Sequence, residues 1–499
     1  MNKKITVLLL FLATWLNTTA QWNNNQLCGT ELPSDKHLDH LEAVNAAYDL
    51  GMERVSNDRI NIPVKFHIVS DFSGNKYDYN TMLTVLCELN EQFESAGMYF
   101  FMRGEVNNIT SNVYYNHTSY ATGTQLMLEH NQPRVVNIYF VQLGQIGLCG
   151  YAYYPGSGPG GTISQGGVMM SIPCSQAGNT TLAHELGHYF GLPHTFDFTS
   201  TNPRDVFAER VTRNTNETLP RLNANCASQG DRFCDTPADY IGFRWNCNSF
   251  AINDSDINND RFQPDPSYFM SYSSDFCMTR FSNQQMNSMR STLATNQSSR
   301  GYLTVFPMPA WDSIRSTVNL IEPLAGSAPQ PANWVFFRWN KAEGATRYHV
   351  RIRRNNLPVT EFITADTVHL FTLPLLQANL TYTYTIRPYN HAFTCMGPSQ
   401  AGTFTTTTAY GASVSEESAA KVQVYPSLYE NGQPLFIRHT DLGVDNLAVY
   451  DAHGREVWSN KLTEVGDLKQ INLPTLPAGM YHLRINSTEG IVFKRIVVK

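Results

Sequence analysis

Two histidines and a glutamate stand at fixed intervals in the segment HELGHYFGLPH, residues 184–194. His184 and His188 are four residues apart, so on a helix both imidazoles lie on one face, about one turn apart, and can reach one ion. Glu185 projects about 100° away from His184 at 3.6 residues per turn. This offset directs its carboxylate toward a metal-bound water rather than toward the metal.

The end of the same segment supplies a third imidazole. Gly191 tolerates the left-handed backbone that ends a helix, and Pro193 cannot continue one, so the chain can return His194 to the ion. Three nitrogens and a water make the open tetrahedral site of a catalytic zinc, with Glu185 as the general base. The alternative is that these histidines are structural side chains on a buried helical face.

The elements before this segment alternate between strand and helix patterns. Residues 60–69 and 135–141 read as strands, and residues 80–95 place apolar side chains on one helical face. A further strand at 168–171 precedes the helix 180–190, which carries the motif. From residue 191 to about 297 the patterning fades while cysteines and turn residues increase, so this part needs disulfides or metals to hold it.

The composition is that of an exported globular protein. The 499 residues contain 42% hydrophobic and 16% charged residues, with a net charge of −6 and no basic run, so we expect several domains and no nucleic-acid partner. Residues 1–20 have a basic end and a short apolar run, typical of a signal peptide, with a membrane anchor as the alternative. No later stretch is long enough for a transmembrane segment. Residues 21–58 are too polar for a core and read as a prosegment.

Beyond the histidine segment, the chain resembles the metzincin metalloproteases and, within them, the pappalysin family. The resemblance covers about residues 58–297. It rests on the long histidine motif, on the sequence YFMSY at 268–272, and on a block with Gly230-Asp231, Asp235-Thr236-Pro237, Cys247 and Cys277-Met278. This block argues against another metzincin branch such as the astacins.

The resemblance implies roles for further residues. Met270 would form the methionine turn below the metal, and Tyr272 would stabilise the oxyanion, the alternative being a packed aromatic. Asp231 and Thr236 match a calcium-binding loop in some relatives, with a metal-free turn as the alternative. Asp275 matches a region that gives relatives a preference for Arg or Lys after the scissile bond, although Arg280 nearby could neutralise it.

Nine cysteines in an exported chain should mostly be paired. Family analogy implies Cys247–Cys277. Relatives have a further cysteine that is missing here, so Cys226 loses its usual partner and is expected to pair with Cys234. Cys149–Cys174 is a plausible pair, whereas Cys87 and Cys395 lie in different predicted domains and are expected to stay single.

Cys28-Gly29 in the prosegment resembles the cysteine switch of some metzincin zymogens. There a thiolate occupies the open zinc position. A simple disulfide is the alternative, since Leu27 stands where the relatives' switch has an arginine. Activation would need cleavage near Arg54 or Arg59.

The C-terminal part reads as two β domains. Residues 327–408 resemble a fibronectin type III domain, in which Tyr382 would make the tyrosine corner. Residues 422–499 resemble the C-terminal sorting domain of bacterial type IX secretion cargo, with a ligand-binding β-sandwich as the alternative. The short motifs VYP at 424–426 and LPAGMY at 476–481 carry this resemblance.

These patterns predict a multidomain protein in which an α/β metzincin catalytic domain is followed by two small all-β sandwich domains. The expected order is signal peptide 1–20, prosegment 21–58, catalytic domain 59–305, connector and fibronectin-like domain 306–408, linker 409–421 and sorting domain 422–499. We expect a secreted or surface zinc endopeptidase, made as a latent zymogen, that acts on proteins or peptides and engages the type IX machinery. A surface adhesin with a vestigial metal site is the alternative, against which the intact Glu185 argues.

Overall fold

The structure is a computed structural model. It describes residues 28–51, 58–144, 146–158, 166–197, 202–248, 254–294, 300–305, 307–332, 335–371, 376–407, 422–439, 444–451, 456–461, 468–487 and 490–499. The expected signal peptide, Arg54 and the linker 409–421 lie outside these residues.

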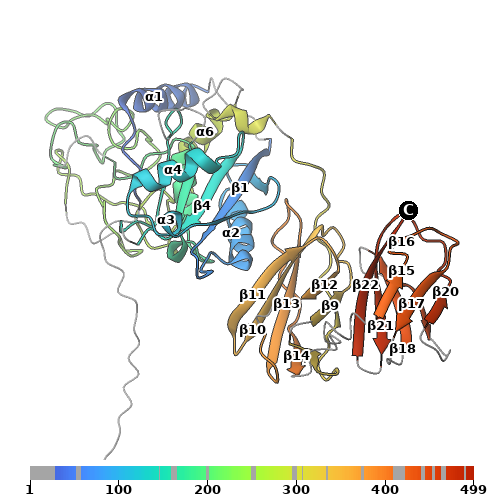
Figure 1. Cartoon of the computed structure of the whole chain (residues 1–499). Helices are drawn as coiled ribbons and strands as arrows, with labels where there is room; N and C mark the ends of the chain where they lie inside the picture. Colours follow the sequence, from blue (N-terminus) through green and yellow to red (C-terminus); the bar gives the residue numbers. More distant parts are fainter. Residues whose placement is uncertain are drawn as a thin grey trace, which may run out of the picture.

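A six-stranded sheet organises the N-terminal part (Figure 1). Its order is β2-β1-β4-β6-β5, and β3 also pairs with β1. Strands β1, β2, β3, β4 and β6 pair in parallel, whereas β5 runs antiparallel to β6 at one edge. The strands are β1 (Ile60–Ser70), β2 (Met98–Met102), β3 (Asn107–Thr110), β4 (Val136–Val141), β5 (Gly150–Ala152) and β6 (Val168–Ser171).

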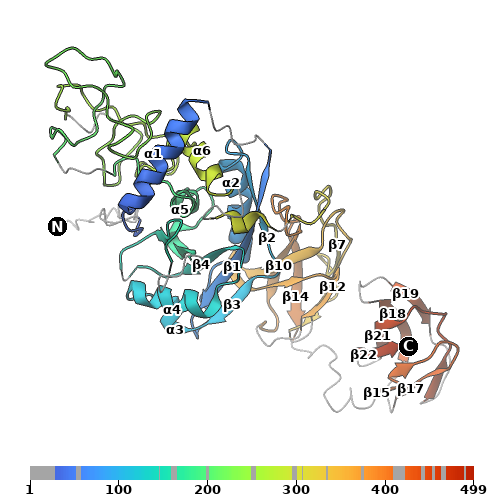
Figure 2. The same cartoon turned by 90° about the horizontal axis from the view of Figure 1, so that it is seen from above.

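Helices cover both faces of this sheet, as a parallel sheet requires (Figure 2). Successive side chains of β4 point to opposite faces, so Phe140 joins the core shared with α2 and α5, and Tyr139 joins the core shared with α4. The helices are α1 (Asp35–Asp49), α2 (Tyr79–Gln92), α3 (Asn112–Tyr115), α4 (Tyr120–His130), α5 (Thr181–Tyr189) and α6 (Asn283–Ser291), with short 3₁₀ turns at Ile172–Cys174 and Gly301–Thr304.

Helix α1 of the predicted prosegment packs against the sheet domain. Ser34 caps it by accepting a hydrogen bond from the His37 backbone N–H, as N-cap serines do. Leu41 is buried in the main core, and Asn45 donates to the Arg232 carbonyl at 2.7 Å. The prosegment therefore has no core of its own but uses that of its neighbour.

The segment after α5 is irregular up to α6. Two disulfides, Cys226–Cys234 and Cys247–Cys277, cross-link it, and Cys149–Cys174 ties β5 to the turn after β6. These are the three pairs that the sequence led us to expect. Cys28 has no disulfide partner, which excludes the simple disulfide considered for it. Among the described residues, no helix combines the length and apolar character needed to cross a bilayer.

Four all-β sheets make up the rest of the chain, in two groups that each enclose a core. In the first, the sheet β11-β10-β13-β14-β8 faces the sheet β12-β9-β7. Its strands are β7 (Leu320–Glu322), β8 (Gln330–Pro331), β9 (Val335–Trp339), β10 (Arg347–Arg354), β11 (Leu357–Thr364), β12 (Val368–Phe371), β13 (Thr381–Tyr389) and β14 (Gly402–Thr407).

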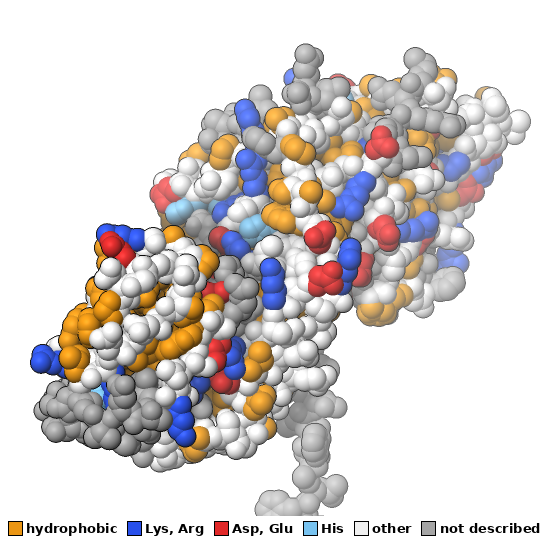
Figure 3. All heavy atoms as spheres, turned by 90° about the vertical axis from the view of Figure 1, so that its right-hand side faces the viewer, with side chains coloured by type: hydrophobic (Ala, Val, Ile, Leu, Met, Phe, Trp, Pro, Cys, Tyr) orange, Lys and Arg blue, Asp and Glu red, His pale blue; other side chains and the backbone are white. Residues whose placement is uncertain are grey.

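The second group combines the sheets β15-β17-β20 and β16-β22-β21-β18-β19. Apolar side chains gather on the nearest face of this end of the molecule (Figure 3). Leu428 and Met480 are both partners of Val497 in strand register, and all three are exposed. The strands are β15 (Val422–Tyr425), β16 (Leu428–Tyr429), β17 (Leu435–His439), β18 (Val444–Asp451), β19 (Glu456–Lys461), β20 (Leu468–Ile471), β21 (Gly479–Ser487) and β22 (Gly490–Val498).

A fourth disulfide joins the first β group to the sheet domain. Cys87 of α2 is bonded to Cys395, which follows β13, so the expectation that both stay single is wrong. That expectation assumed that the two domains do not touch, whereas in the structure they pack against each other. Around the bond, Arg387 donates to the Thr84 hydroxyl at 2.7 Å, and Tyr99 donates to the Ala392 carbonyl at 2.6 Å.

We expect the Cys87→Ser, Cys395→Ser double variant to lose about 2–4 kcal/mol of stability, because the bond closes a loop of about 300 residues in the unfolded chain. Thermal unfolding of purified protein measures the loss, and limited proteolysis should cut the connector near 307–319 faster. The docking contacts remain in this variant, so unchanged unfolding and unchanged proteolysis would show that they alone hold the two parts.

Candidate metal centre and active site

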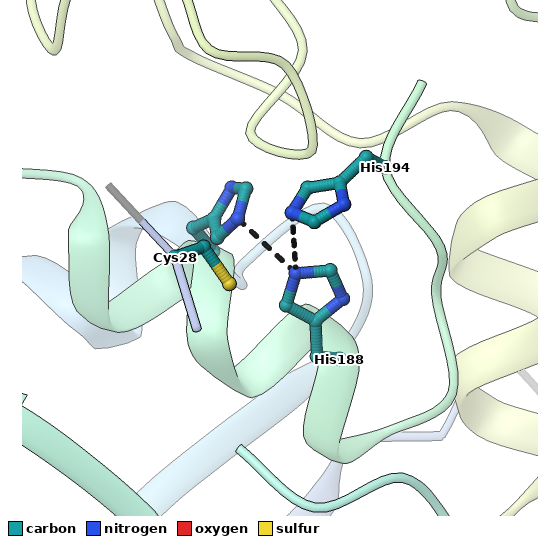
Figure 4. Close-up of side chains that lie close together, drawn as sticks. Cys28, His188 and His194 are labelled. Carbon is teal, nitrogen blue, oxygen red and sulfur yellow. Dashed lines mark hydrogen bonds between the residues drawn. The ribbon is translucent and has the colours of Figure 1, made fainter. Parts of the chain in front are cut away.

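Three buried imidazoles converge at the C-terminal end of α5 (Figure 4). The Nε2 atom of His188 lies 3.2 Å from Nε2 of His184 and 3.0 Å from Nε2 of His194. The turn that brings His194 back is made at Gly191, whose φ of +103° favours glycine. A side chain there would also approach His37 of α1 to within 3.0 Å.

The opposite nitrogen of each ring is held by an oxygen. Nδ1 of His184 lies 2.7 Å from the Phe269 carbonyl, and Nδ1 of His188 lies 2.6 Å from the Leu192 carbonyl. Nδ1 of His194 lies 3.1 Å from Oδ1 of Asp197. Carbonyls and carboxylates only accept hydrogen bonds, so each Nδ1 carries the ring proton. Each Nε2 therefore has a free lone pair, which it directs toward the Nε2 atoms of the other two histidines.

This arrangement fits a tetrahedral metal ion. Ligand nitrogens at the usual zinc distance of about 2.0–2.1 Å lie roughly 3.3 Å from one another. This is close to the 3.2 and 3.0 Å that separate Nε2 of His188 from Nε2 of His184 and of His194. Burial lowers the pKa of His184 to about 3 and that of His188 well below its usual range, so both rings are neutral, which is the metal-binding form.

The Cys28 thiol points toward the same histidines (Figure 4). Its Sγ and the three imidazoles each offer one ligand atom, all within 4.8 Å of one another. Cys28 pairs in parallel with Gly150 of β5, and the Gly29 N–H donates to the Gly150 carbonyl at 2.8 Å. The prosegment thus forms a β-bridge with the edge strand β5, next to the metal centre.

Glu185 lies beside the histidines and is fully buried. Its Oε2 accepts a hydrogen bond from the Thr30 hydroxyl at 3.1 Å and lies 3.6 Å from Cys28 Sγ. Its Oε1 is buried without a described partner. Burial raises the pKa of Glu185 to about 8. Gly150 makes room for this carboxylate, since a Cβ there would lie 2.8 Å from Oε1.

Met270 and Tyr272 enclose the centre from below and from one side. A Cβ on Gly187 of the motif would meet the Met270 sulfur at 2.3 Å, so this glycine lets the methionine pack directly beneath α5. The Tyr272 ring lies 5.0 Å from that of His194 and 4.5 Å from that of Phe196, and it lines a small cavity together with Cys28.

Comparisons with known proteins agree with this geometry. The family described as pregnancy-associated plasma protein-A matches residues 124–294, and a metallo-peptidase family M12B, reprolysin-like, matches residues 40–195. A secretion system C-terminal sorting domain matches residues 432–499. An extracellular metalloprotease of Pyricularia oryzae is 24% identical over 52% of this chain and 87% of its own length. One of Arthroderma gypseum is 26% identical over 46% of this chain and 71% of its own length.

The chain is a pappalysin-like metzincin with a type IX secretion tail. This metzincin is a zinc metalloendopeptidase that is secreted or displayed at the cell surface. Among solved structures, mature mirolysin of Tannerella forsythia in complex with a cleaved peptide is 19% identical, with a TM-score of 0.39 over 50% of this chain and 97% of that one. A promirolysin mutant of the same organism, also 19% identical, gives a TM-score of 0.40 over 56% and 97%.

The loop matched to calcium binding in relatives holds an arginine in this metzincin. The Arg213 guanidinium donates to Oε1 of the buried Glu209 at 2.8 Å and to the carbonyls of Thr236 and Cys234 at 2.5 and 3.1 Å. The Thr236 hydroxyl donates to Asp231 at 2.9 Å. Arg213 thus bonds the carbonyl of Thr236, one of the two residues expected to hold calcium. The Asp231 carboxylate instead accepts from the Thr236 hydroxyl and the Phe233 N–H, so calcium binding by this loop stays a prediction that the nearby arginine disfavours.

We expect the melting temperature of the protein to shift by less than about 1 °C when calcium is added in calcium-free buffer that contains zinc. Arg213→Ala should lose roughly 3–5 kcal/mol, because it leaves Glu209 buried without its partner, and calcium should then raise its melting temperature. The exposed Arg204→Ala serves as the control. A wild-type melting temperature that rises with calcium would contradict this assignment.

Asp275 lies at the N-terminal end of α5 and is already bonded on both oxygens. Oδ1 accepts from the Thr180 backbone and hydroxyl at 2.9 and 2.8 Å, and Oδ2 accepts from Arg244 at 2.7 Å. The expectation that Arg280 could neutralise Asp275 is wrong, since Arg280 pairs with Asp265 instead. The neutralising residue is Arg244, whose loop pairs with the Tyr272 loop through the Trp245–Ser273 bridge.

Sequence reasoning missed several residues that complete the site. Asp197 follows His194 by three residues, a spacing that could have suggested a partner for that ring. Thr30 lies two residues after Cys28 and holds Glu185. Tyr154, whose hydroxyl lies 3.2 Å from Nδ1 of His188, and Arg244 come from irregular loops in which the sequence gives no signal.

Proposed function

We propose that this metzincin is a latent endopeptidase of extracellular proteins, in which His184, His188 and His194 bind zinc and Glu185 is the general base. The observation that carries the proposal is the buried cluster of three inward-facing Nε2 atoms beside a buried carboxylate. The ion, when bound, supplies a Lewis acid that polarises a peptide carbonyl and makes water more acidic.

Side chains of the protein would transfer the protons of the reaction and stabilise the negative charge that develops on the substrate carbonyl oxygen. Oε1 of Glu185 is free of described partners, so it can accept a proton from water and deliver it to the leaving amine. Tyr272 lines the same cavity as Cys28, and after the prosegment leaves its hydroxyl could donate to the oxyanion of the substrate carbonyl. Met270 would support α5 from below.

The same geometry supports latency. Cys28 lies close enough to the three imidazoles to act as a fourth ligand. The strand pairing of Gly29 with Gly150 occupies the sheet edge that an extended substrate would use. His37 of α1 anchors the prosegment by its 2.7 Å contact with the Gly191 carbonyl. Removal of the prosegment would open the metal and the sheet edge together.

We assign the β groups to a connector and fibronectin type III-like sandwich, 306–408, and a sorting sandwich, 422–499, after a prosegment at 21–58 and a catalytic domain at 59–305. The Tyr382 hydroxyl accepts from the Gln377 backbone N–H at 2.8 Å, which supports a tyrosine corner. The exposed side chains of Leu428, Met480 and Val497, which are neighbours in strand register, form a patch suited to an apolar contact with the secretion machinery.

Two expectations from the sequence, a calcium site and a basic preference, are not part of this proposal. Calcium is left out, because Arg213 already bonds the Thr236 carbonyl. The preference for Arg or Lys after the scissile bond required a free Asp275 carboxylate. Since Arg244 binds that carboxylate, we do not include a basic preference.

Cleavage of casein by the matured protein tests the proposal. Activity that is lost on metal removal and restored by zinc would support it. The adhesin alternative predicts that wild type and Glu185→Ala cleave casein equally poorly while both still bind a ligand. The intact set of metal-binding histidines favours the protease.

A further inference from the structure

The first β group carries an aromatic side chain on its outer face. Side chains alternate along β9, so that Val335, Phe337 and Trp339 enter the core of this group. Phe336 points the opposite way and is nevertheless partly buried. A large ring on the outer face of a sheet would be exposed to solvent unless another part of the protein covered it. In this chain the covering side chains come from the second β group.

The second β group has the same feature on the outer face of its five-stranded sheet. On β18, Val449 enters the core, whereas Tyr450 lies on the other face and is still only 3% exposed. On the neighbouring strands β21 and β22, Arg484 and Phe493 are register partners. Arg484 lies two residues beyond the register partner of Tyr450, so both residues of this pair share the outer face with Tyr450.

The two outer faces are in contact where β9 lies beside β22 (Figure 1). The Phe336 ring stacks on the Phe493 ring, with 5.4 Å between the centroids and 27° between the planes. The centroid of the Tyr450 ring is 6.1 Å from that of Phe336. These separations lie in the range in which aromatic pairs attract one another beyond the area that they bury. The ring of the first group is therefore inserted between two rings of the second.

A carboxylate beside the rings joins an arginine of each group. Oε1 of Glu322 on β7 lies 3.5 Å from Nη2 of Arg338 on β9 and 3.8 Å from Nη1 of Arg484 on β21. Glu322 and Arg338 are also register partners, so their side chains stand on one face. Partly exposed ion pairs of this kind contribute more to the orientation of a contact than to its strength.

The contact covers only part of the outer face of the second β group. Met480 and Val497 lie on the same face, four residues along β21 and β22 from Arg484 and Phe493, and they too are register partners. Both are exposed, as is Leu428 beside them. The first group thus covers the aromatic part of this face and leaves its aliphatic part open.

We propose that the first β group is an intramolecular docking surface for the second, centred on Phe336 and Glu322, and that this docking sets the direction in which the patch of Leu428, Met480 and Val497 is presented. Along the chain, residues 408–421 join the two groups. Without docking, the patch would have no fixed direction relative to the rest of the molecule. With docking, a partner of the patch approaches beside the first β group.

Small-angle X-ray scattering of the purified full-length chain tests this docking without any need for catalysis. Phe336→Ala should raise the radius of gyration by about 2 Å, because an unconstrained chain as long as residues 408–421 spans roughly 20 Å on average. The dye ANS should also bind more strongly, since the rings that faced Phe336 become accessible. Phe72→Ala removes a phenylalanine that is 74% exposed on the sheet domain, and it should change neither measurement.

A charge exchange tests the second element of the surface. Glu322→Arg places a third guanidinium beside Arg338 and Arg484 and should raise the radius of gyration as Phe336→Ala does. Adding Arg484→Glu to Glu322→Arg restores an opposite pair across the contact and should bring the radius of gyration back toward the wild-type value. A role of Glu322 confined to the first β group would give no such rescue.

The proposal is overturned if wild type, Phe336→Ala and Glu322→Arg have the same radius of gyration. It is also overturned if wild type is a dimer that Phe336→Ala converts to a monomer, because the surface would then belong to a second copy of the chain. Phe493→Ala removes the same ring contact from the other group, so it replaces Phe336→Ala if that variant does not fold.

Discussion

Glu185→Gln in the matured enzyme is expected to lower kcat/KM for peptide cleavage by about 100- to 10,000-fold. The amide keeps the shape of the side chain but has no carboxylate to accept the proton of the attacking water. Initial rates on a peptide with a cleavable reporter measure the effect.

Two controls separate chemistry from folding. Metal analysis should find one zinc per chain in wild type and in Glu185→Gln, since the three histidine ligands are untouched. Glu129→Gln, which changes an exposed carboxylate on α4, should leave kcat/KM within about twofold. Retention of more than one tenth of the activity in Glu185→Gln would contradict the role of this residue as the general base.

Cys28→Ala is expected to shorten the activation lag of the purified zymogen at least about tenfold, because it removes the proposed fourth ligand of the metal. Burial beside Glu185 raises the pKa of the Cys28 thiol, so a bound cation is what would stabilise the thiolate. In the cobalt-substituted zymogen, wild type should show a thiolate-to-metal charge-transfer absorption that Cys28→Ala lacks.

A second variant distinguishes metal ligation from docking of the prosegment. Asn45→Ala removes the 2.7 Å hydrogen bond from α1 to the Arg232 carbonyl and leaves Cys28 in place. Its lag should change by less than about twofold, and its cobalt spectrum should equal that of wild type. An unchanged lag in Cys28→Ala, with the same absorption, would exclude the cysteine switch.

Local spacing was enough to predict the helix, the turn and the convergence of the three histidines. His184 and His188 are set by the helical repeat, and Gly191 makes the turn that returns His194. The succession of strands and helices of an α/β domain also follows from local patterns of apolar residues. These features depend on residues that are near one another in the chain, which is why the sequence reveals them.

The contacts that were missed depend on residues far apart in the chain. Cys87 and Cys395 are 308 residues apart, and their pairing depends on how two domains dock. Arg213 and Arg244 lie in loops without periodic patterning, so nothing local indicates which carboxylates they reach. The expectations of calcium and of a basic preference did not take these arginines into account, because the matched motifs contain the carboxylates and not the arginines beside them. Both expectations stay predictions.

The disulfide between Cys87 and Cys395 also determines which part of the molecule carries a pulling force. If the C-terminal tail is pulled or anchored, tension that arrives along β14 reaches Cys395 and passes through the disulfide directly into α2, bypassing β13 and the connector at 307–319. Helix α2 packs near β2, at one end of the strand order, whereas the edge strand β5 beside the metal centre lies at the other end. Helix α2 also packs against the metal-binding helix α5. A tethered molecule would therefore bear load on a helix that touches the metal centre's own helix, rather than on the connector.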